Sequence, residues 1–210
     1  MHIAVLGATG RTGRHLVDQA LDRGHTITAV VRDPARLPRT STEQLNVATA
    51  DVMDPAALAA VLTGHDAVVS AIGPVGRGPS SACTDSARAL TEAMPRAAVG
   101  RLVVISAAGI TTAGDGPFTR IVVKPLLNRF LRHSFADMRG MEREVTGSDL
   151  DWTIVRPPQL TDRPFTGRYR RSVGSNVRRG FRVCRADLAH AVLDAADDSA
   201  LTRTTLSVAA

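Results

Sequence analysis

Three glycines follow a short apolar segment at the start of this chain and limit what it can fold into. Residues 2–6 are mostly apolar, and Gly7, Gly10 and Gly13 come directly after them. Glycine permits a sharp turn off a strand, close approach of a phosphate to the backbone, and tight packing of a following helix on a sheet. The first N–H groups of such a helix also attract an anion. The spacing therefore predicts a turn that binds the pyrophosphate of a dinucleotide.

The residues on either side of the glycines support this interpretation. Residues 2–6 and 26–31 are apolar runs typical of buried strands, and residues 11–23 have the periodicity of an amphipathic helix. Gly24 stands where a helix C-terminal cap is expected. The pattern predicts a strand–helix–strand unit. A glycine turn without any ligand is the alternative, because a lone glycine-rich run also occurs in ordinary turns.

The residue that ends the second predicted strand bears on the choice of cofactor. A carboxylate there usually binds the ribose 2′-hydroxyl of NAD, whereas an arginine accepts the 2′-phosphate of NADP. This chain has Arg32 and then Asp33, with Arg36 and Arg39 close behind. Guanidinium groups offer paired donors to phosphate oxygens, so we predict NADP(H) rather than NAD(H). Two alternatives stay open: the arginines form a solvated face, or Asp33 serves a ribose hydroxyl.

Composition argues against several classes of function. The 210 residues carry a formal net charge of +6, but the 26 Lys and Arg residues include a single lysine, and aromatic residues make up 3%. Scattered arginines without a stacking surface argue against a nucleic-acid partner. No apolar run has the length of a membrane span, so we expect a soluble, cytoplasmic monomer or homodimer with no membrane partner. Cys83 and Cys184 lack metal-site spacing, and no metal is predicted.

Strand and helix patterns alternate along the rest of the chain. This rhythm predicts an α/β fold with a Rossmann-like, doubly wound parallel sheet, in one NAD(P)-binding domain over residues 1–210. Residues 111–133 and 159–184 are expected to contribute a small C-terminal substrate lobe. We expect further strands at 45–50, 67–71, 101–105, 151–155 and 204–208, helices at 54–62, 81–98, 118–131, 134–146 and 187–196, and a hairpin within 169–183. Asp54 and Asp187 are the expected N-caps of their helices.

Several further motifs, taken together and in order, resemble those of a known family. They are Gly7-Ala8-Thr9-Gly10-Arg11-Thr12-Gly13, Val31-Arg32-Asp33, Ala50-Asp51-Val52, Val69-Ser70-Ala71-Ile72-Gly73, Val104-Ile105-Ser106, Leu150-Asp151-Trp152-Thr153-Ile154-Val155-Arg156-Pro157 and Arg185-Ala186-Asp187-Leu188-Ala189. On these motifs the chain resembles the atypical short-chain dehydrogenase/reductases of the NmrA-like type, particularly the flavin reductase and biliverdin reductase B-like group. The resemblance covers nearly the whole chain and implies an NAD(P)-binding reductase.

The resemblance also implies cofactor-binding roles for particular residues. The pyrophosphate would be held by the turn Gly7-Ala8-Thr9-Gly10-Arg11-Thr12-Gly13, and the 2′-phosphate would be held by Arg32. The adenine would contact Asp51 and Val52, and the central phosphate and ribose would contact Ala71, Ile72 and Gly73. The nicotinamide would lie between Ser106 and Pro157. Two of these residues have ordinary alternatives. Asp51 is also typical of a turn or helix cap, and Ser106 can end its strand by bonding local backbone.

The proton donor usual in short-chain dehydrogenases is missing from its expected place. The family pattern is Tyr-x-x-x-Lys on the helix before the sixth strand, and counting back from that strand puts Ser134 and Met138 at the two positions. The single tyrosine and lysine, Tyr169 and Lys124, lie elsewhere in the sequence. Reduction of a ketone needs an acid for the alkoxide that forms. We therefore expect hydride transfer to a conjugated acceptor such as a flavin, quinone or tetrapyrrole, which spreads the incoming charge.

Ser106 and His133 are the candidates for direct roles in this chemistry. Ser106 is expected to donate a hydrogen bond to substrate or cofactor, and His133 is either a proton source or a solvent-facing residue at a helix start. The arginines crowded into residues 163–185 either bind an acidic acceptor or form a solvated surface. Two functions stay open: an NADPH-dependent reductase of a small conjugated acceptor, and an NADP(H)-binding redox sensor without turnover. An isomerase or tailoring enzyme uses the same fold and leaves no distinct mark.

Replacement of Arg32 tests the predicted cofactor preference. Arg32→Ala should weaken binding of NADPH far more than binding of NADH, because only NADPH carries the 2′-phosphate. Binding of each nucleotide is followed by the fluorescence of Trp152, the single tryptophan. Equal losses for the two nucleotides contradict the preference for NADP(H).

Overall fold

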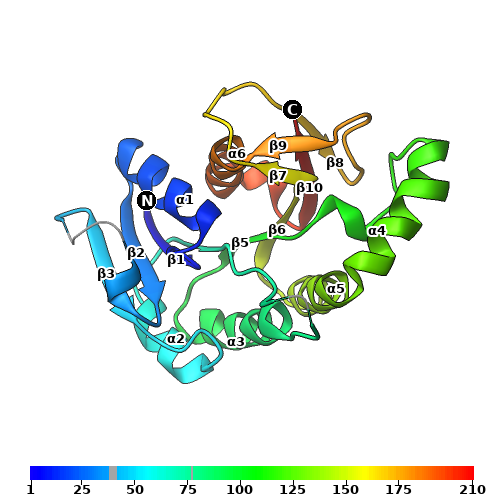
Figure 1. Cartoon of the computed structure of the whole chain (residues 1–210). Coiled ribbons are helices and arrows are strands. Elements are labelled where there is room, and N and C mark those ends of the chain that lie inside the picture. Colours follow the sequence, from blue (N-terminus) through cyan, green and yellow to red (C-terminus); the bar gives the residue numbers. More distant parts are fainter. Residues whose placement is uncertain (38–41, 77) are drawn as a thin grey trace.

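A continuous, mostly parallel β-sheet forms the centre of the structure (Figure 1). The computed structural model describes residues 1–37, 42–76 and 78–210. Within these residues the sheet has eight strands in the order β3-β2-β1-β4-β5-β6-β10-β8, and β8 alone runs antiparallel to its neighbour. The strands are β1 (His2–Leu6), β2 (Thr26–Val31), β3 (Leu45–Thr49), β4 (Ala67–Ser70), β5 (Arg101–Ile105), β6 (Asp151–Arg156), β8 (Arg170–Val173) and β10 (Thr204–Ala209). The predicted doubly wound α/β fold is confirmed.

Helices cover both faces of the sheet, which accounts for the continuous apolar sequence of its strands. One face carries α1 (Arg11–Asp22) and α6 (Arg185–Asp197), which pack against each other. The other face carries α2 (Pro55–Leu62), α3 (Ala82–Arg96) and α5 (Arg132–Thr146) (Figure 1). Each face has its own buried apolar cluster. Packing on both faces therefore fixes the sheet, including the carboxyl ends of its strands.

The strand order reverses at the centre of the sheet, where β1 and β4 lie side by side. From β1 the chain moves outward to β2 and β3, and it then returns to lay β4 against the other side of β1. It continues outward through β5 and β6. In open sheets of this kind a ligand binds at the carboxyl ends of the strands, where the order reverses. The turn after β1 and the segment after β4 meet at that crevice.

Two predicted helix ends are present, and each has a local cause. Asp54 Oδ1 accepts hydrogen bonds from the N–H groups of Ala56 and Ala57 at 2.8 and 3.2 Å and so caps α2. Gly24 has a φ of +78° and donates its N–H to the Leu21 carbonyl at 2.9 Å just beyond α1. A left-handed residue at this position favours glycine. These ends depend on neighbouring residues, and the sequence predicts them correctly.

The predicted hairpin within residues 169–183 is wrong. Strand β8 pairs antiparallel with β10, whereas β9 (Arg182–Cys184) pairs parallel with β7 (Gln159–Thr161) in a second, two-stranded sheet. Without β8, the strand β10 would leave a row of unpaired backbone groups at the edge of the main sheet. Strands of three or four residues carry too little pattern to specify their partners. Long-range backbone pairing decides the arrangement.

Asp187 does not cap the last helix as predicted. Helix α6 begins at Arg185, and the Cys184 sulfur accepts the N–H of Asp187 at 3.2 Å. The Asp187 carboxylate instead accepts the N–H and hydroxyl of Thr166 at 2.9 and 2.6 Å, and the N–H of Gly167 at 3.0 Å. Burial raises the pKa of Asp187, but these hydrogen bonds outweigh burial and hold the pKa below its usual value. Asp187 therefore anchors residues 166–167 to α6.

The predicted helix over 118–131 is present and contains one wide turn. Residues Thr119–Val123 form a π-helical turn, and α4 (Lys124–Phe130) continues from it. The N–H of Lys124 donates to the carbonyl of Thr119, five residues earlier. Pro125 lacks an N–H group, and its ring conflicts with a regular preceding turn. The widened turn accommodates this proline.

Gly13→Ala should destabilise the fold. A Cβ at this position would lie far inside van der Waals distance of the Gly7 carbonyl oxygen, so α1 would have to move away from β1. We expect the free energy of unfolding, measured by urea denaturation, to fall by about 1–3 kcal/mol despite the better helix propensity of alanine. Gly116→Ala is the control, because a Cβ there meets open space. Equal effects of the two substitutions contradict the role assigned to Gly13.

Candidate functional site

The glycine turn presents bare backbone at the carboxyl ends of β1 and β4. Gly7 has a φ of +77°, and a Cβ there would lie 2.9 Å from the carbonyl carbon and oxygen of Ala71. The Gly10 N–H donates to the Gly7 carbonyl at 2.9 Å and closes the turn before α1. Helix α1 begins at Arg11, and its N-cap residue, Gly10, has no side chain that could bond the first N–H groups. The cradle fits the pyrophosphate of a nucleotide, because it combines free donors with the positive end of a helix.

A hollow of about 270 Å³ lies beside this turn and is lined by two arginines. Its walls are Thr9, Arg32, Asp33 and Arg36. Asp33 Oδ1 accepts the N–H of Ala35 at 3.1 Å, so this carboxylate caps the short turn that follows β2. The hollow therefore suits an anion. Arg39, which the sequence places nearby, lies outside the described residues.

Asp51, Val52 and the segment 71–73 follow along the same edge. The Ala71 N–H donates to the Leu6 carbonyl at 2.9 Å, which holds Ala71, Ile72 and Gly73 next to the glycine turn. Asp51 Oδ1 accepts the N–H of Met53 at 3.0 Å and shapes the turn before α2. Asp51 therefore has the turn-forming role predicted as the alternative to adenine binding. A contact of Asp51 or Val52 with adenine stays a prediction.

Ser106 brings a buried hydroxyl group to this edge. Its N–H donates to the Val155 carbonyl at 2.8 Å, and the residue is 2% exposed. Its Oγ has no hydrogen-bond partner among the described residues. Pro157 is held close to the same loop, because its carbonyl accepts the N–H of Ala108 at 2.8 Å. A buried hydroxyl without a hydrogen-bond partner lowers the stability of the fold, and a ligand that accepts a hydrogen bond from it removes this penalty. This orphaned group fits a nicotinamide carboxamide.

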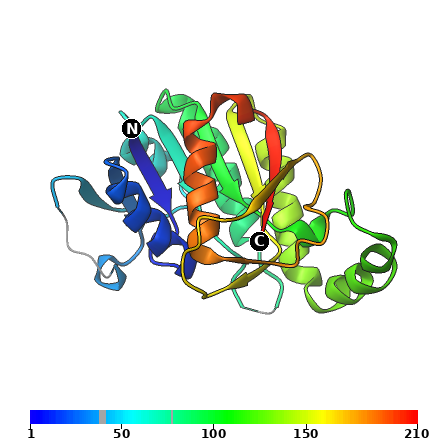
Figure 2. The same cartoon turned by 90° about the horizontal axis from the view of Figure 1, so that it is seen from above.

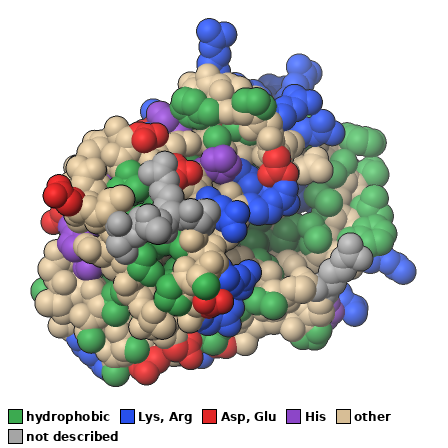
Figure 3. Space-filling model, turned by 60° about the vertical axis from the view of Figure 1, so that its left-hand side comes forward, with side chains coloured by type: hydrophobic (Ala, Val, Ile, Leu, Met, Phe, Trp, Pro, Cys, Tyr) green, Lys and Arg blue, Asp and Glu red, His purple; other side chains and the backbone are tan. Residues whose placement is uncertain are grey.

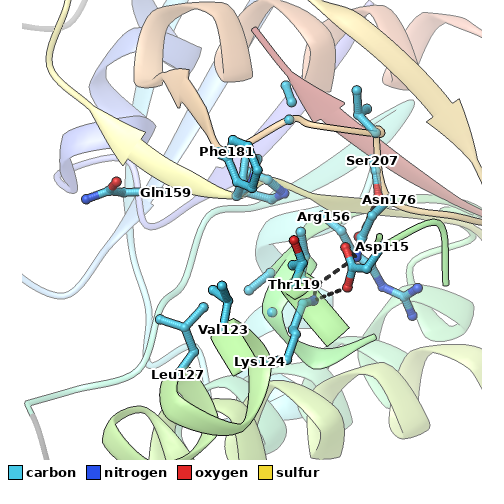
Figure 4. Close-up of a pocket in the computed structure, with 18 of the residues that line it drawn as sticks. Asp115, Thr119, Val123, Lys124, Leu127, Arg156, Gln159, Asn176, Phe181 and Ser207 are labelled. Carbon is cyan, nitrogen blue, oxygen red and sulfur yellow. Dashed lines mark hydrogen bonds and ion pairs between the residues drawn. The ribbon is translucent and has the colours of Figure 1, made fainter. Parts of the chain in front are cut away.

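A cavity of about 680 Å³ opens next to the loop that follows β5 (Figure 4). Its volume lies within the range of small-molecule sites. Val123 reaches it from the π-helical turn that precedes α4, and Leu127 reaches it from α4 (Figure 4). Phe181 faces it from the segment between β8 and β9 (Figure 4). Further apolar lining residues are Leu131, Phe135, Met138, Pro157 and Pro158. Figure 3 shows a hollow with hydrophobic side chains inside it and Lys and Arg side chains gathered around it. The cavity suits a flat, largely apolar molecule.

One end of the cavity is polar and is held by three buried side chains (Figure 4). The Lys124 ammonium donates to the carbonyls of Ala108 and Thr111. It also pairs with the Asp115 carboxylate at 3.2 Å. Asn176 Nδ2 donates to the same two carbonyls at 3.2 Å each and to Asp115 Oδ1 at 3.0 Å. Burial lowers the pKa of Lys124, and Asp115 opposes that shift. The cluster ties together α4, the loop after β5 and the segment between β8 and β9.

The two positions at which short-chain dehydrogenases carry tyrosine and lysine face this cavity. Ser134 and Met138 both line it from α5. His133, the candidate proton source, is half-buried, and its Nε2 accepts the Nε–H of Arg132 at 3.1 Å. The residues that line the cavity do not include His133. A role for His133 in proton transfer therefore has no support from its position.

Tyr169 is engaged away from the cavity lining. Its hydroxyl donates to Asp194 at 2.8 Å and lies 2.8 Å from Nδ1 of His190. Burial and the hydrogen bond to Asp194 raise the pKa of Tyr169. Both effects disfavour release of its proton, so Tyr169 is a structural residue that ties the start of β8 to α6.

Two buried carboxylates fix α5 beside the cavity. Asp137 accepts the N–H groups of Cys83 and Thr84 at 3.2 and 2.9 Å, at the start of α3. Glu142 accepts two hydrogen bonds from Arg156 at 2.8 and 2.6 Å. Arg156 also lines the cavity, but Glu142 already balances its charge. These contacts position the wall that carries Ser134.

The arginines of residues 163–185 do not act as one group. Arg179 lines the cavity. Arg185 instead pairs with Asp162 at 2.6 Å, and Arg11 of the glycine turn pairs with the same carboxylate. Arg179 therefore borders the cavity. Arg185 is linked through Asp162 to Arg11 of the glycine turn.

Sequence analysis does not identify Asp115, Lys124 or Asn176 as part of the site. Asp115 and Asn176 lie 61 residues apart, and no motif joins them. The available signal is composition, because Lys124 is the single lysine among 26 Lys and Arg residues. In a chain that otherwise uses arginine, a single lysine indicates a buried position where a compact ammonium group fits and a guanidinium group does not.

The chain belongs to a family of NAD(P)H-binding proteins, and the match to this family covers residues 7–199. The 3-diazoavenalumate denitrifying reductase of a Streptomyces species is 32% identical over 193 residues, covering 85% of this chain and 62% of that protein. A short-chain dehydrogenase/reductase from Veillonella parvula in complex with NADP has a TM-score of 0.83 at 20% identity, covering 100% and 94% of the two chains. ChuY, an anaerobilin reductase from Escherichia coli O157:H7, has a TM-score of 0.77 at 23% identity, covering 100% and 97%. The predicted membership of an NAD(P)-binding family is confirmed.

Removal of the Lys124 charge should destabilise the protein strongly. Lys124→Met leaves the Asp115 carboxylate buried without its cation, and such a loss typically costs about 3 kcal/mol or more in the free energy of unfolding. The double variant Lys124→Met with Asp115→Leu should recover part of this loss, because it leaves no unpaired charge. Urea denaturation measures both variants.

Arg88→Met is the control for that experiment. Arg88 pairs with Glu144 at 2.9 Å on the surface, where solvent screens the interaction, so its removal should have a much smaller effect. Equal effects of Lys124→Met and Arg88→Met contradict a structural role for the buried cluster.

Proposed function

We propose that this protein is an NADPH-dependent reductase that transfers hydride to a conjugated small molecule such as a flavin or a quinone. The observation that carries the proposal is the buried Ser106 hydroxyl, which has no partner among the described residues. It stands at the end of β5, on the edge where the glycine turn lies and next to the loop that borders an apolar cavity. A nicotinamide ring placed there has a hydrogen-bond donor beside it and room for an acceptor.

The arginines beside the glycine turn support a phosphorylated nucleotide. Arg32 and Arg36 line the hollow next to Thr9, whereas Asp33 is engaged by backbone. Paired guanidinium donors match phosphate in charge and geometry. The similar protein from Veillonella parvula is in complex with NADP, which is consistent with the same choice here.

In the proposed complex the other predicted residues take the roles that the resemblance implies. The turn from Gly7 to Gly13 holds the pyrophosphate through its backbone, and Arg32 holds the 2′-phosphate. Residues 71–73 border the central phosphate and ribose, because the Ala71 N–H fixes them beside the turn. Ser106 and Pro157 border the nicotinamide.

The cavity explains how the chain would direct the reaction. A bound reduced nicotinamide supplies a hydride. The Ser106 hydroxyl orients the carboxamide or the acceptor by donating a hydrogen bond to an oxygen atom. Apolar walls that include Val123, Leu127 and Phe181 hold a flat ring against that position and exclude water.

The polar groups around the cavity favour a conjugated acceptor over a simple ketone. Ser134 and Met138 stand where an acid and its supporting cation are usual, and neither side chain is an acid at neutral pH. The Lys124 ammonium is held by two carbonyls and a carboxylate. An acceptor that spreads the incoming negative charge over a conjugated system takes its proton from solvent and needs no strong acid from the chain.

The names of two similar proteins agree with reductase activity. The Streptomyces relative is named as a denitrifying reductase, and ChuY as an anaerobilin reductase. Together with membership of an NAD(P)H-binding family, they support an oxidoreductase acting on a small molecule.

Oxidation of NADPH, followed by absorbance, tests the proposed function. FMN, menadione and biliverdin are offered in turn, and we expect turnover with at least one of them. Ser106→Ala should lower that turnover about tenfold or more, because one hydrogen bond to the reacting groups is lost. The variant should unfold no more easily than the parent without ligand, since the hydroxyl has no protein partner among the described residues.

Ser199→Ala is the matched control, because Ser199 is exposed and lies just before β10, away from the carboxyl edge. It should leave turnover unchanged. Tight NADPH binding without oxidation of any acceptor overturns the reductase proposal and favours a redox sensor. Absence of heat in calorimetry with NADPH and NADH overturns nucleotide binding itself.

A further inference from the structure

The helical segment 118–131 exposes a large apolar surface. Phe118, Ile121 and Phe130 are 70%, 71% and 74% exposed. Val122 and Leu126, between them, are 50% and 56% exposed. Five strongly exposed apolar side chains on one short segment are uncommon in a soluble protein and mark a site of interaction. We name these five side chains the outer face of the segment.

The opposite side of the same segment is anchored to the protein. Val123, Leu127 and Leu131 line the cavity, and Lys124 is buried in its contact with Asp115. Helix α4 stands at the border of the molecule (Figures 1 and 2). Part of the segment therefore forms cavity wall, and the outer face is exposed. The outer face is held in place by the inner one and is not a frayed end.

Positive charge surrounds the outer face. Residues 116–136 contain no Asp or Glu, whereas Arg120, Arg129 and Arg132 are exposed. None of these three arginines forms an ion pair within the described part of the chain. The flanking carboxylates point inward, since Asp115 binds Lys124 and Asn176. Asp137, on the other flank, binds the start of α3. The face is therefore apolar with a cationic border.

We infer that this face docks on an anionic phospholipid surface. An amphipathic helix with aromatic and aliphatic side chains on one side and arginines beside them lies in the plane of a membrane interface. Its apolar side chains enter the boundary between headgroups and acyl chains, and its guanidinium groups meet lipid phosphates. The five outer-face residues and the three arginines supply both parts of this interaction.

A second copy of the chain fits the face less well. A two-fold interface places the same surface on both partners, so it would bring the arginines of one copy near those of the other. With no carboxylate in residues 116–136, that repulsion has no local compensation. An anionic lipid surface complements the charge directly.

The expectation of no membrane partner rests on the lack of an apolar run long enough for a span. None of the described helices is long and apolar enough to cross a membrane. A helix that lies on the surface has no such length requirement, and its signal is exposure, which appears only once the chain is folded.

Sedimentation with vesicles tests the inference. Vesicles of phosphatidylglycerol and phosphatidylcholine in equal amounts should carry the protein down at low salt, and vesicles of phosphatidylcholine alone should carry down much less. Binding should fall when NaCl is raised to about 0.5 M, because salt screens the contact between arginines and phosphates. Ile121→Ser with Phe130→Ser should lower the partition coefficient at least tenfold, and Arg120→Gln with Arg129→Gln should remove most of the salt dependence.

Phe165→Ser with Val173→Ser is the matched control, because it removes two apolar side chains that are 51% and 61% exposed elsewhere on the chain. It should leave vesicle binding unchanged. Circular dichroism and thermal unfolding show whether each variant folds as the parent does. Failure of the folded parent to bind anionic vesicles at low salt overturns the inference, as does equal binding by the Ile121/Phe130 variant. A dimer in sedimentation velocity that this variant abolishes, without vesicle binding by the parent, assigns the face to a second copy instead.

Discussion

The close approach of helix α1 to the end of strand β1 is the constraint on which the cofactor side of the structure depends. Gly13 lets the helix lie against the Gly7 carbonyl, and Gly7 lets the turn pass close to Ala71. These two approaches bring the ends of β1 and β4 and the start of α1 to one place. They also leave backbone groups, with no side chains, at the position where a pyrophosphate would bind. Larger residues would separate the very elements that form the cradle.

The substrate side depends on a different kind of interaction. Apolar packing has no direction, so it does not by itself define where a helix stops sliding. Buried hydrogen-bonded charges do, because their geometry is narrow. Asp137 joins α5 to the start of α3, Glu142 joins it to Arg156, and Lys124 joins α4 to the loop after β5. These contacts position the elements around the cavity, which has a polar end and apolar walls.

The accuracy of prediction follows from the range of the interactions involved. The glycine turn, the cap at Asp54 and the left-handed Gly24 depend on neighbours within a few residues, and the sequence predicts them correctly. The hairpin within 169–183 and the cap at Asp187 are wrong, because their true partners lie in β7, β10 and residues 166–167. The cluster around Lys124 joins segments more than 50 residues apart, and no local pattern records it.

Local sequence is sufficient for the NAD(P)-binding family, the fold class and the glycine turn of this protein, because glycine spacing and alternating apolar runs act through nearest neighbours and through burial on both faces of a sheet. Folding establishes the rest: the polar end of the cavity, the unpaired hydroxyl of Ser106 and the outward apolar face of residues 118–131. Whether a side chain is buried, paired or exposed depends on what distant segments pack against it. That is a property of the assembled structure, and a residue type alone does not contain it.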